Sequence, residues 1–156
     1  MIELTPEVIL IAKAKRFADT AHGLQMYGTF PYTYHLGGVA SLVAARMKGD
    51  PMLSTYVAAA WLHDVLEDTT ATHKDLVDEF GLCIAEVVQY LTKVEGEEYE
   101  EYIRKVLKSA IAREIKICDT MFNLESSFRE NNTKRVAKYA RQLDILVQGV
   151  WYECDY

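Results

Sequence analysis

The segment from residue 58 to residue 68 reads Ala-Ala-Ala-Trp-Leu-His-Asp-Val-Leu-Glu-Asp, an apolar helical run that ends in four titratable side chains. On a continuous helix these four would share one face, because side chains four residues apart lie one above the other. They are His63, Asp64, Glu67 and Asp68. Three are carboxylates, which repel one another when packed closely, and a bound cation is the simplest compensation. The segment therefore predicts a helix beside a metal site.

A plainer interpretation is a solvated acidic turn at the end of a helix, with His63 as an ordinary polar residue, since adjacent His and Asp residues are common. A metal site needs donors from elsewhere in the chain, because a divalent ion takes about four to six ligands. His35, where a loop with glycine and proline enters an apolar helix, and Asp119, a lone acid at the end of an apolar segment, are the candidates. Taken alone, each also fits a capping or surface role.

Further motifs accompany these residues in a fixed order along the chain. They are Ala21-His22, Gln25, Gly28, Pro31-Tyr32, His35, residues 59–69, Phe80-Gly81, Thr92-Lys93, residues 116–119 and Asn123. Together they resemble the H…HD…D signature of the HD superfamily of metal-dependent phosphohydrolases. More narrowly, they resemble the hydrolase domain of the RelA/SpoT alarmone enzymes and their small single-domain relatives, over about residues 10 to 128.

The resemblance implies one divalent ion held by four side chains, His35, His63, Asp64 and Asp119. Two imidazoles and two carboxylates suit a borderline ion; the carboxylates and the resemblance favour Mn²⁺, with Fe²⁺ and Zn²⁺ as alternatives. The resemblance further implies that Glu67 and Asp68 position or deprotonate the attacking water. Asn123 corresponds to the substrate-binding Asn of the family. The implied reaction removes pyrophosphate from the 3′ position of guanosine tetra- or pentaphosphate.

The chain departs from its relatives where they carry basic residues that contact the nucleotide. Met26 and Tyr27 stand there, and Thr120 follows Asp119 in place of Arg or Lys. We expect Tyr27 to stack on a base without selecting guanine, because every base has a π-face. Lys116, close to Asp119, is expected to contact the substrate. Most other helical cations are expected to solvate a face, and these are Lys93, Arg104, Lys105 and Lys108.

Two other functions remain open. One is a phosphohydrolase that acts on another nucleotide, either 3′-phosphorylated or a 5′-monophosphate. The other is a metal-binding regulatory module without catalysis. Glu67 and Asp68 weigh against the module, because metal binding alone would not require them.

Composition agrees with an ordinary globular protein of one domain, with 156 residues, 50% apolar and 26% charged. The net charge of −6 argues against polynucleotide binding and leaves a small nucleotide as the expected partner. No apolar run approaches the roughly 20 residues needed to cross a bilayer, and no signal peptide is indicated, so a cytoplasmic protein is expected. Cys83, Cys118 and Cys154 are widely spaced and predict neither a disulfide framework nor a thiolate zinc site.

Helical patterns cover almost the whole chain and predict an all-α bundle of about six to eight helices, forming a single domain over residues 1–156. Thr5-Pro6 and Asp50-Pro51 are helix-start signals. A last amphipathic helix is expected at about residues 133–152, with its Tyr and Trp side chains in core or dimer contacts, so a homo-oligomer is possible. No segment alternates with period two, so no sheet is expected.

Overall fold

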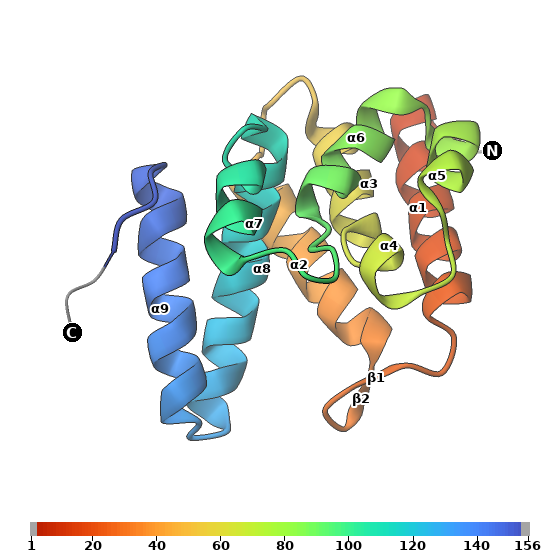
Figure 1. Cartoon of the computed structure of the whole chain (residues 1–156). Helices are drawn as coiled ribbons and strands as arrows, with labels where there is room; N and C mark the ends of the chain where they lie inside the picture. Colours follow the sequence, from red (N-terminus) through yellow and green to blue (C-terminus); the bar gives the residue numbers. More distant parts are fainter. Residues whose placement is uncertain (1–2, 154–156) are drawn as a thin grey trace.

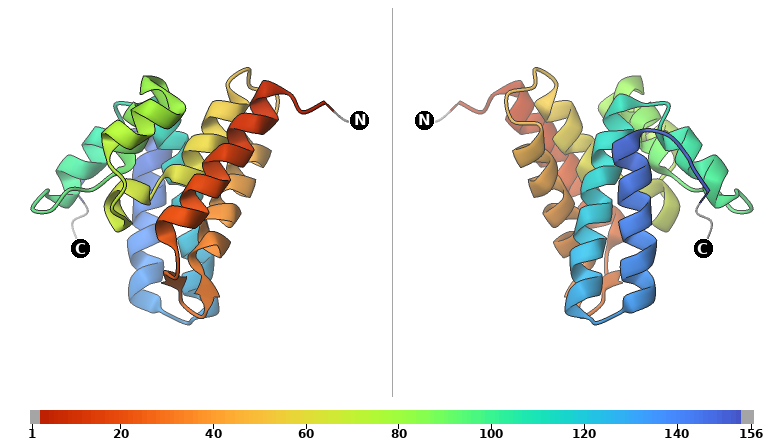
Figure 2. Two further views of the ribbon diagram at one scale, coloured as in Figure 1. Left: turned by 90° about the vertical axis from the view of Figure 1, so that its right-hand side faces the viewer. Right: turned by 90° about the vertical axis from the view of Figure 1, so that its left-hand side faces the viewer.

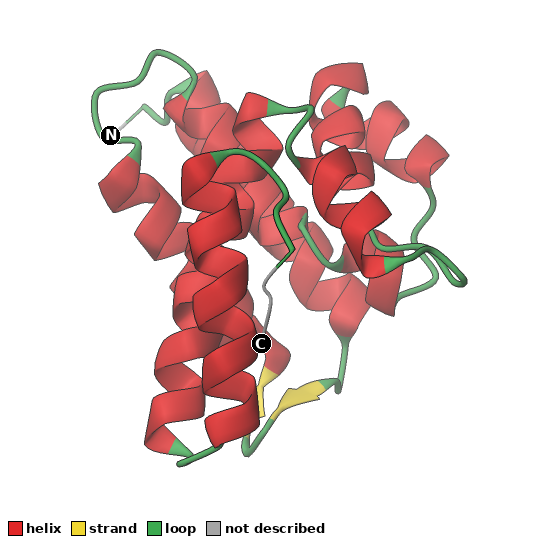
Figure 3. Cartoon of the chain, turned by 60° about the vertical axis from the view of Figure 1, so that its left-hand side comes forward, coloured by secondary structure: helices red, strands yellow, loops and turns green. Residues whose placement is uncertain are grey.

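The computed structural model describes residues 3–153, which form a bundle of helices with one short hairpin (Figures 1 and 3). In chain order the elements are α1 (Pro6–His22), β1 (Met26–Tyr27), β2 (Phe30–Pro31), α2 (Tyr32–Arg46), α3 (Leu53–Leu62), α4 (Val65–Asp68), α5 (His73–Phe80), α6 (Leu82–Leu91), α7 (Tyr99–Val106), α8 (Ala110–Arg129) and α9 (Thr133–Gln148). The helical bundle expected from the sequence is confirmed, with α4 as a single additional turn.

Of the two helix-start signals in the sequence, the first is confirmed and the second is not. Thr5 accepts a hydrogen bond from the backbone N–H of Val8 at 3.4 Å, and the proline after it opens α1. The Asp50-Pro51 signal was placed too early, because α3 begins only at Leu53. Asp50 instead forms a turn, in which its Oδ1 accepts from the N–H of Met52 at 2.8 Å.

The centre of the bundle is α3, which packs against α1, α2, α6 and α8 (Figure 1). Ala58, Ala59 and Ala60 are fully buried in it, and their small side chains let the surrounding helices approach closely. Among residues 3–153, no helix combines the length and the apolar character needed to span a membrane. Cys83 and Cys118 are unpaired, with Cys118 buried as a small core residue, while Cys154 lies outside the described residues.

The helix is interrupted between α3 and α4, so the prediction of a continuous helix through His63 and Asp64 is wrong. α3 ends at Leu62, α4 begins at Val65, and the N–H of His63 reaches back only to the carbonyl of Ala60, at 3.5 Å. Neighbouring side chains on a regular helix point about 100° apart and do not face a common point. The break removes this restriction, and both side chains can approach the same place.

The hairpin formed by β1 and β2 was not expected from the sequence. Its strands have two residues each and pair antiparallel, Met26 with Pro31 and Tyr27 with Phe30, which is too short for any alternation to show. Gly28 provides the positive φ of 58° that the turn requires. Figure 2 shows the hairpin at the same end of the molecule as the turn between α8 and α9.

The last helix is shorter than expected, since α9 ends at Gln148 and Gly149 caps it in the left-handed conformation at φ 75°. α9 runs antiparallel beside α8 (Figure 2) and buries Gln142, Ile145 and Leu146. Trp151 lies beyond its end and packs edge-on against Tyr99, with ring centroids 5.7 Å apart.

Two glycines allow α2 to lie close to its neighbours. A Cβ at Gly37 would stand 3.0 Å from the ring of Trp61 in α3, and one at Gly38 would stand 2.1 Å from the ring of Phe122 in α8. The Phe122 ring cannot move away easily, because it is itself packed edge-on against His35, at a centroid distance of 5.1 Å. Gly38 therefore sets the approach of α2 to α8.

We predict that Gly38→Ala destabilises the protein by about 1–3 kcal/mol, because the added methyl group overpacks this contact. Urea or thermal unfolding measures the change. Ser41→Ala, on the exposed side of the same helix, is the matched control and should stay close to wild type. An unchanged unfolding midpoint for Gly38→Ala would show that α2 has room to move.

Candidate metal centre and catalytic cavity

Four side chains from three parts of the fold bring donor atoms close together, three of them in one mutual cluster and the fourth, Asp119, in contact with the two imidazoles of that cluster. The four are His35 of α2, His63 and Asp64 of the break between α3 and α4, and Asp119 of α8. The Nε2 atom of His35 lies 3.3 Å from Nε2 of His63, 3.2 Å from Oδ1 of Asp119 and 3.5 Å from Oδ2 of Asp64. The Nε2 atom of His63 lies 3.1 Å from the Asp64 oxygen and 3.6 Å from the Asp119 oxygen. Three of the four predicted ligands thus form one cluster, and Asp119 lies against its two imidazoles; the assignment of all four as ligands stays a prediction.

The spacing fits a single metal ion. Metal–ligand bonds of about 2.0–2.2 Å separate neighbouring donor atoms by about 3.0–3.6 Å. The donor atoms of His35, His63 and Asp64 all lie within 4.8 Å of one another. The Nδ1–H group of His63 donates to the carbonyl oxygen of Ala60 at 2.7 Å, which leaves the Nε2 lone pair free for a metal. Two imidazole nitrogens that face each other this closely need a proton or a cation between them.

The charges around these atoms favour a cation. Burial alone would lower the pKa of His63, but the carboxylates of Asp64 and Asp119 outweigh it and raise that pKa well above its usual value. Burial likewise opposes ionisation of Asp119, yet Lys116 and the two histidines hold its pKa well below the usual range. The pKa of Asp64 is likewise held well below its usual value, by His63 and His35 against the effect of burial, so both carboxylates favour the ionised form beside a positive charge, which a metal ion would also supply.

Two further side chains hold the Asp119 carboxylate, and a third supports them. Lys116 Nζ donates to its Oδ2 at 2.8 Å, and Asn123 Nδ2 donates to its Oδ1 at 2.9 Å. Tyr27 donates its hydroxyl hydrogen to Asn123 Oδ1 at 2.8 Å, and its ring stacks on that of His35, with centroids 4.8 Å apart. The three residues predicted to contact the substrate thus also orient the donor set.

Of the predicted catalytic pair, only Glu67 lines the cavity in front of these donors. Its Oε1 accepts a hydrogen bond from the backbone N–H of Lys93 at 2.7 Å. The residue is largely exposed, but its carboxylate loses hydration at the cavity wall, which raises the pKa of Glu67. Asp68 is exposed and is not among the residues that line the cavity. Its Oδ2 atom accepts a hydrogen bond from Gln25 Nε2 at 3.1 Å.

Three of the donor residues, His35, Asp64 and Asp119, line a cavity of about 420 Å³, and His63 lies buried behind them. The lining also includes residues that the sequence did not single out for a site. α9 contributes Arg135, Lys138 and Tyr139 to its wall, and Lys93 lines it as well. Lys93 is exposed, as the sequence led us to expect, and also borders the cavity, whereas Tyr139 faces the cavity in place of the core or dimer contact expected of the aromatic residues in α9. The cations counterbalance the carboxylates and fit an anionic substrate.

A second cavity of about 480 Å³ shares Tyr27 as a wall with the first. It lies between the hairpin and the end of α8, and Phe30 and Tyr34 stack within it at a centroid distance of 4.3 Å. Arg129 and Glu130 provide polar groups at its edge. This aromatic lining suits a planar ring.

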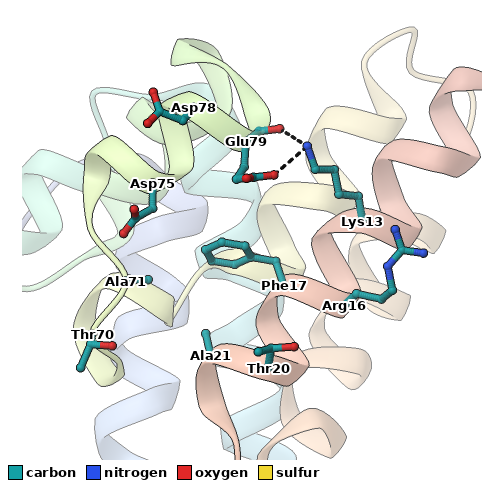
Figure 4. A pocket seen from close by; sticks show the side chains of 10 residues that line it. All are labelled: Lys13, Arg16, Phe17, Thr20, Ala21, Thr70, Ala71, Asp75, Asp78 and Glu79. Atoms are coloured by element: carbon teal, nitrogen blue, oxygen red, sulfur yellow. Dashed lines mark hydrogen bonds and ion pairs between the residues drawn. The ribbon is translucent and has the colours of Figure 1, made fainter.

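A larger hollow, of about 700 Å³, lies between α1 and α5, and Figure 4 shows its lining. Lys13 reaches across it to the Glu79 carboxylate at 2.9 Å, and the ring of Phe17 packs edge-on against Phe80 at 5.4 Å. Among residues 3–153, those that line this hollow include none of the site residues predicted from the sequence. We therefore assign the chemistry to the smaller cavity.

A helical bundle in which two histidines and two aspartates converge, two of them adjacent in sequence, is the arrangement expected of an HD domain. The chain matches the HD domain family over residues 14–145 and belongs to it. This match extends past residue 128, where we expected the resemblance to end, and includes most of α9.

Individual relatives show which members of the HD domain family the chain resembles. The guanosine-3′,5′-bis(diphosphate) 3′-pyrophosphohydrolase of Aquifex aeolicus is 32% identical over 155 residues, covering 90% of this chain and 22% of that protein. The chain thus spans about a fifth of that relative. The enzyme of the same name called MESH1, from Danio rerio, is 29% identical over 154 residues, covering 90% of this chain and 84% of that protein. The predicted resemblance to RelA/SpoT-type hydrolases is confirmed.

A solved structure shows the same fold. It is described as a metazoan ortholog of SpoT that hydrolyses ppGpp, and it superimposes with a TM-score of 0.74 at 23% identity. The match covers 94% of this chain and 88% of that one.

We predict that His63→Ala lowers the affinity for a divalent ion by more than about tenfold, because it removes one of the four converging donors. Elemental analysis and calorimetric titration measure the loss. His73→Ala, at the partly exposed histidine that begins α5, is the control and should retain the ion. Full occupancy in His63→Ala would exclude the site described above.

Proposed function

We propose that this chain is a metal-dependent phosphohydrolase that removes the 3′-pyrophosphate from guanosine tetra- or pentaphosphate or from a closely related nucleotide. The observation that carries the proposal is the cluster of His35, His63 and Asp64, whose two imidazoles also contact Asp119, beside a cavity with cations in its wall. The names of the relatives describe this activity for those proteins.

His35, His63, Asp64 and Asp119 would hold one divalent ion, for which we propose Mn²⁺, with Fe²⁺ or Zn²⁺ as alternatives. When bound, such an ion supplies Lewis acidity, which makes water a stronger nucleophile and polarises a phosphoryl oxygen. Tyr32 would keep Asp64 in place, since its hydroxyl donates to Oδ2 at 2.6 Å.

Glu67 is the proposed general base. Its carboxylate lies in the cavity wall, and its raised pKa makes it a better proton acceptor for an attacking water than an ordinary surface carboxylate. Asp68 would assist from the rim, where Gln25 holds one of its oxygens. Both assignments follow from the resemblance and from these positions.

The two cavities suggest how a nucleotide lies. Its phosphates would face Lys116, Arg135 and Lys138, and its base would enter the aromatic cavity on the other side of Tyr27. Asn123 would hydrogen-bond the sugar or phosphate between them. Stacking on aromatic rings accepts any base, so we propose weak discrimination between guanine and adenine.

Other sequence-based expectations stay predictions. These are a single domain over residues 1–156, a cytoplasmic location, the absence of polynucleotide and membrane partners, and a possible homo-oligomer. A different nucleotide, or a metal-binding module without turnover, remains the alternative function.

We predict that Glu67→Gln keeps the metal and lowers kcat by about 10²–10⁴-fold, because the amide cannot accept the proton. Metal analysis and steady-state kinetics separate the two effects. Glu7→Gln, in the exposed first turn of α1, is the control. Loss of the metal together with activity would make Glu67 a ligand, and an unchanged kcat would remove it from the mechanism.

The proposed substrate is tested with Mn²⁺-loaded protein and a nucleotide panel. We expect pyrophosphate release from guanosine and adenosine 3′,5′-bispyrophosphates at similar kcat/KM, and little reaction with a 3′-phosphate or a 5′-monophosphate. Met26→Arg, in β1, should raise kcat/KM for the guanosine compound, because a charge-assisted hydrogen bond contributes about 1.5–3 kcal/mol before screening. Met52→Arg, at another exposed methionine, is the control.

Three outcomes of this panel contradict the proposal. Strong guanine selectivity in the wild type would show that other residues read the base. Reaction with 5′-monophosphates alone would favour a different phosphohydrolase. A metal-loaded protein that hydrolyses none of the compounds would favour the regulatory module.

A further inference from the structure

His22 is a buried titratable residue that the mechanism above does not use. It is the last residue of α1 and is 6% exposed. Its Nδ1 atom lies 2.8 Å from Oε1 of Gln25, and its ring stacks on that of Tyr32 with centroids 4.7 Å apart and an interplanar angle of 26°. Its Nε2 atom is buried without a hydrogen-bond partner among the described residues.

Packing alone does not account for an imidazole at this position. An apolar ring would stack on Tyr32 equally well and would leave no buried nitrogen unpaired. What the imidazole adds is the Nδ1–H group that meets Gln25. The hydrogen bond to Gln25 is therefore the feature that distinguishes His22 from a core residue.

This hydrogen bond continues to Asp68. A side-chain amide has one acceptor oxygen and one donor nitrogen, so accepting from His22 turns the Gln25 nitrogen outward. That nitrogen donates to Asp68 Oδ2 at 3.1 Å. The chain of donors runs in one direction, from the buried end of α1 to the carboxylate at the end of α4.

The hydrogen bond between Gln25 and Asp68 joins two segments that are far apart in the sequence. Gln25 lies in the loop after α1, whereas Asp68 is the last residue of α4. Asp68 is exposed, and an exposed carboxylate on a short helix samples several rotamers unless a partner holds it. The Gln25 amide is itself held by a residue that burial fixes in place.

We propose that His22 is a positioning residue, which acts through Gln25 to hold the Asp68 carboxylate in the orientation that the hydrolytic reaction uses. This inference rests on the proposed function. His22 touches neither the substrate nor the metal donors, so its effect appears in turnover and leaves metal binding unchanged.

The kinetic test compares His22→Phe, which keeps the ring but loses the donor, with Gln25→Met and with the double variant. Each single variant should lower kcat about tenfold, the factor expected for one lost hydrogen bond, with KM and metal content unchanged. The double variant should be no worse than either single variant, because both act on one link. His22→Asn should recover part of kcat, since its amide nitrogen replaces Nδ1. His73→Phe is the matched control and should keep the wild-type kcat.

A structural test does not depend on turnover. In the ¹H–¹⁵N spectrum of the Zn²⁺-loaded protein, with His22→Phe used for assignment, the proton of His22 should reside on Nδ1. Gln25→Met should remove this preference. A proton on Nε2 in the wild type would overturn the inference whether or not a nucleotide is hydrolysed.

The kinetic results can also overturn it. An unchanged kcat in His22→Phe, no recovery in His22→Asn, or losses that multiply in the double variant would each show that His22 does not act through Gln25. Loss of the metal in His22→Phe would instead show that His22 acts by holding Tyr32, which donates to Asp64. If the wild type hydrolyses no compound of the panel, the proposed function fails, and the spectrum alone decides the Gln25 link.

Discussion

The buried carboxylate of Asp119 is the group on which the arrangement of the site depends. A carboxylate removed from water stays ionised only when cations and hydrogen-bond donors surround it. Lys116 meets one of its oxygens, and Asn123 meets the other, together with the two imidazoles from α2 and the α3–α4 break. Three elements are thus held to one anion, and the close contact of α2 with α8 at Gly38 is what makes this possible.

The interruption of the helix between α3 and α4 brings the side chains of His63 and Asp64 together, which a regular helix would not do. Adjacent residues of a helix diverge, so His63 and Asp64 could not both offer a donor atom to one ion. In the broken segment their donor atoms are 3.1 Å apart. The carbonyl of Ala60 accepts the Nδ1–H of His63 at 2.7 Å, besides a longer bond of 3.5 Å from the backbone N–H of the same residue, and so orients the imidazole. This one local irregularity therefore orients the His63 imidazole and brings the donor atoms of His63 and Asp64 together.

The sequence predicted the donor residues and the helical bundle, because motif order and helical periodicity are local or can be matched along the chain. It did not predict the α9 wall of the cavity. Arg135 and Lys138 look like ordinary solvated cations, and only the docking of α9 decides which of its faces meets the site. That docking includes a buried hydrogen bond of 2.6 Å from Gln142 to Thr120, between residues 22 positions apart. The two-residue strands of the hairpin carry no periodic signal at all.

Tyr27 forms a wall shared by two cavities. The arrangement of the donor side chains is thereby separated from the shape of the second cavity. The donor side chains lie on the side of the first cavity, whereas Gly28, Thr29 and Phe30 line the second. A change of shape or polarity in this turn alters what fits beside the metal centre without exchanging a donor residue. The hairpin is therefore a part of the structure through which the choice of the proposed substrate can be changed independently of the helices that carry the donor side chains.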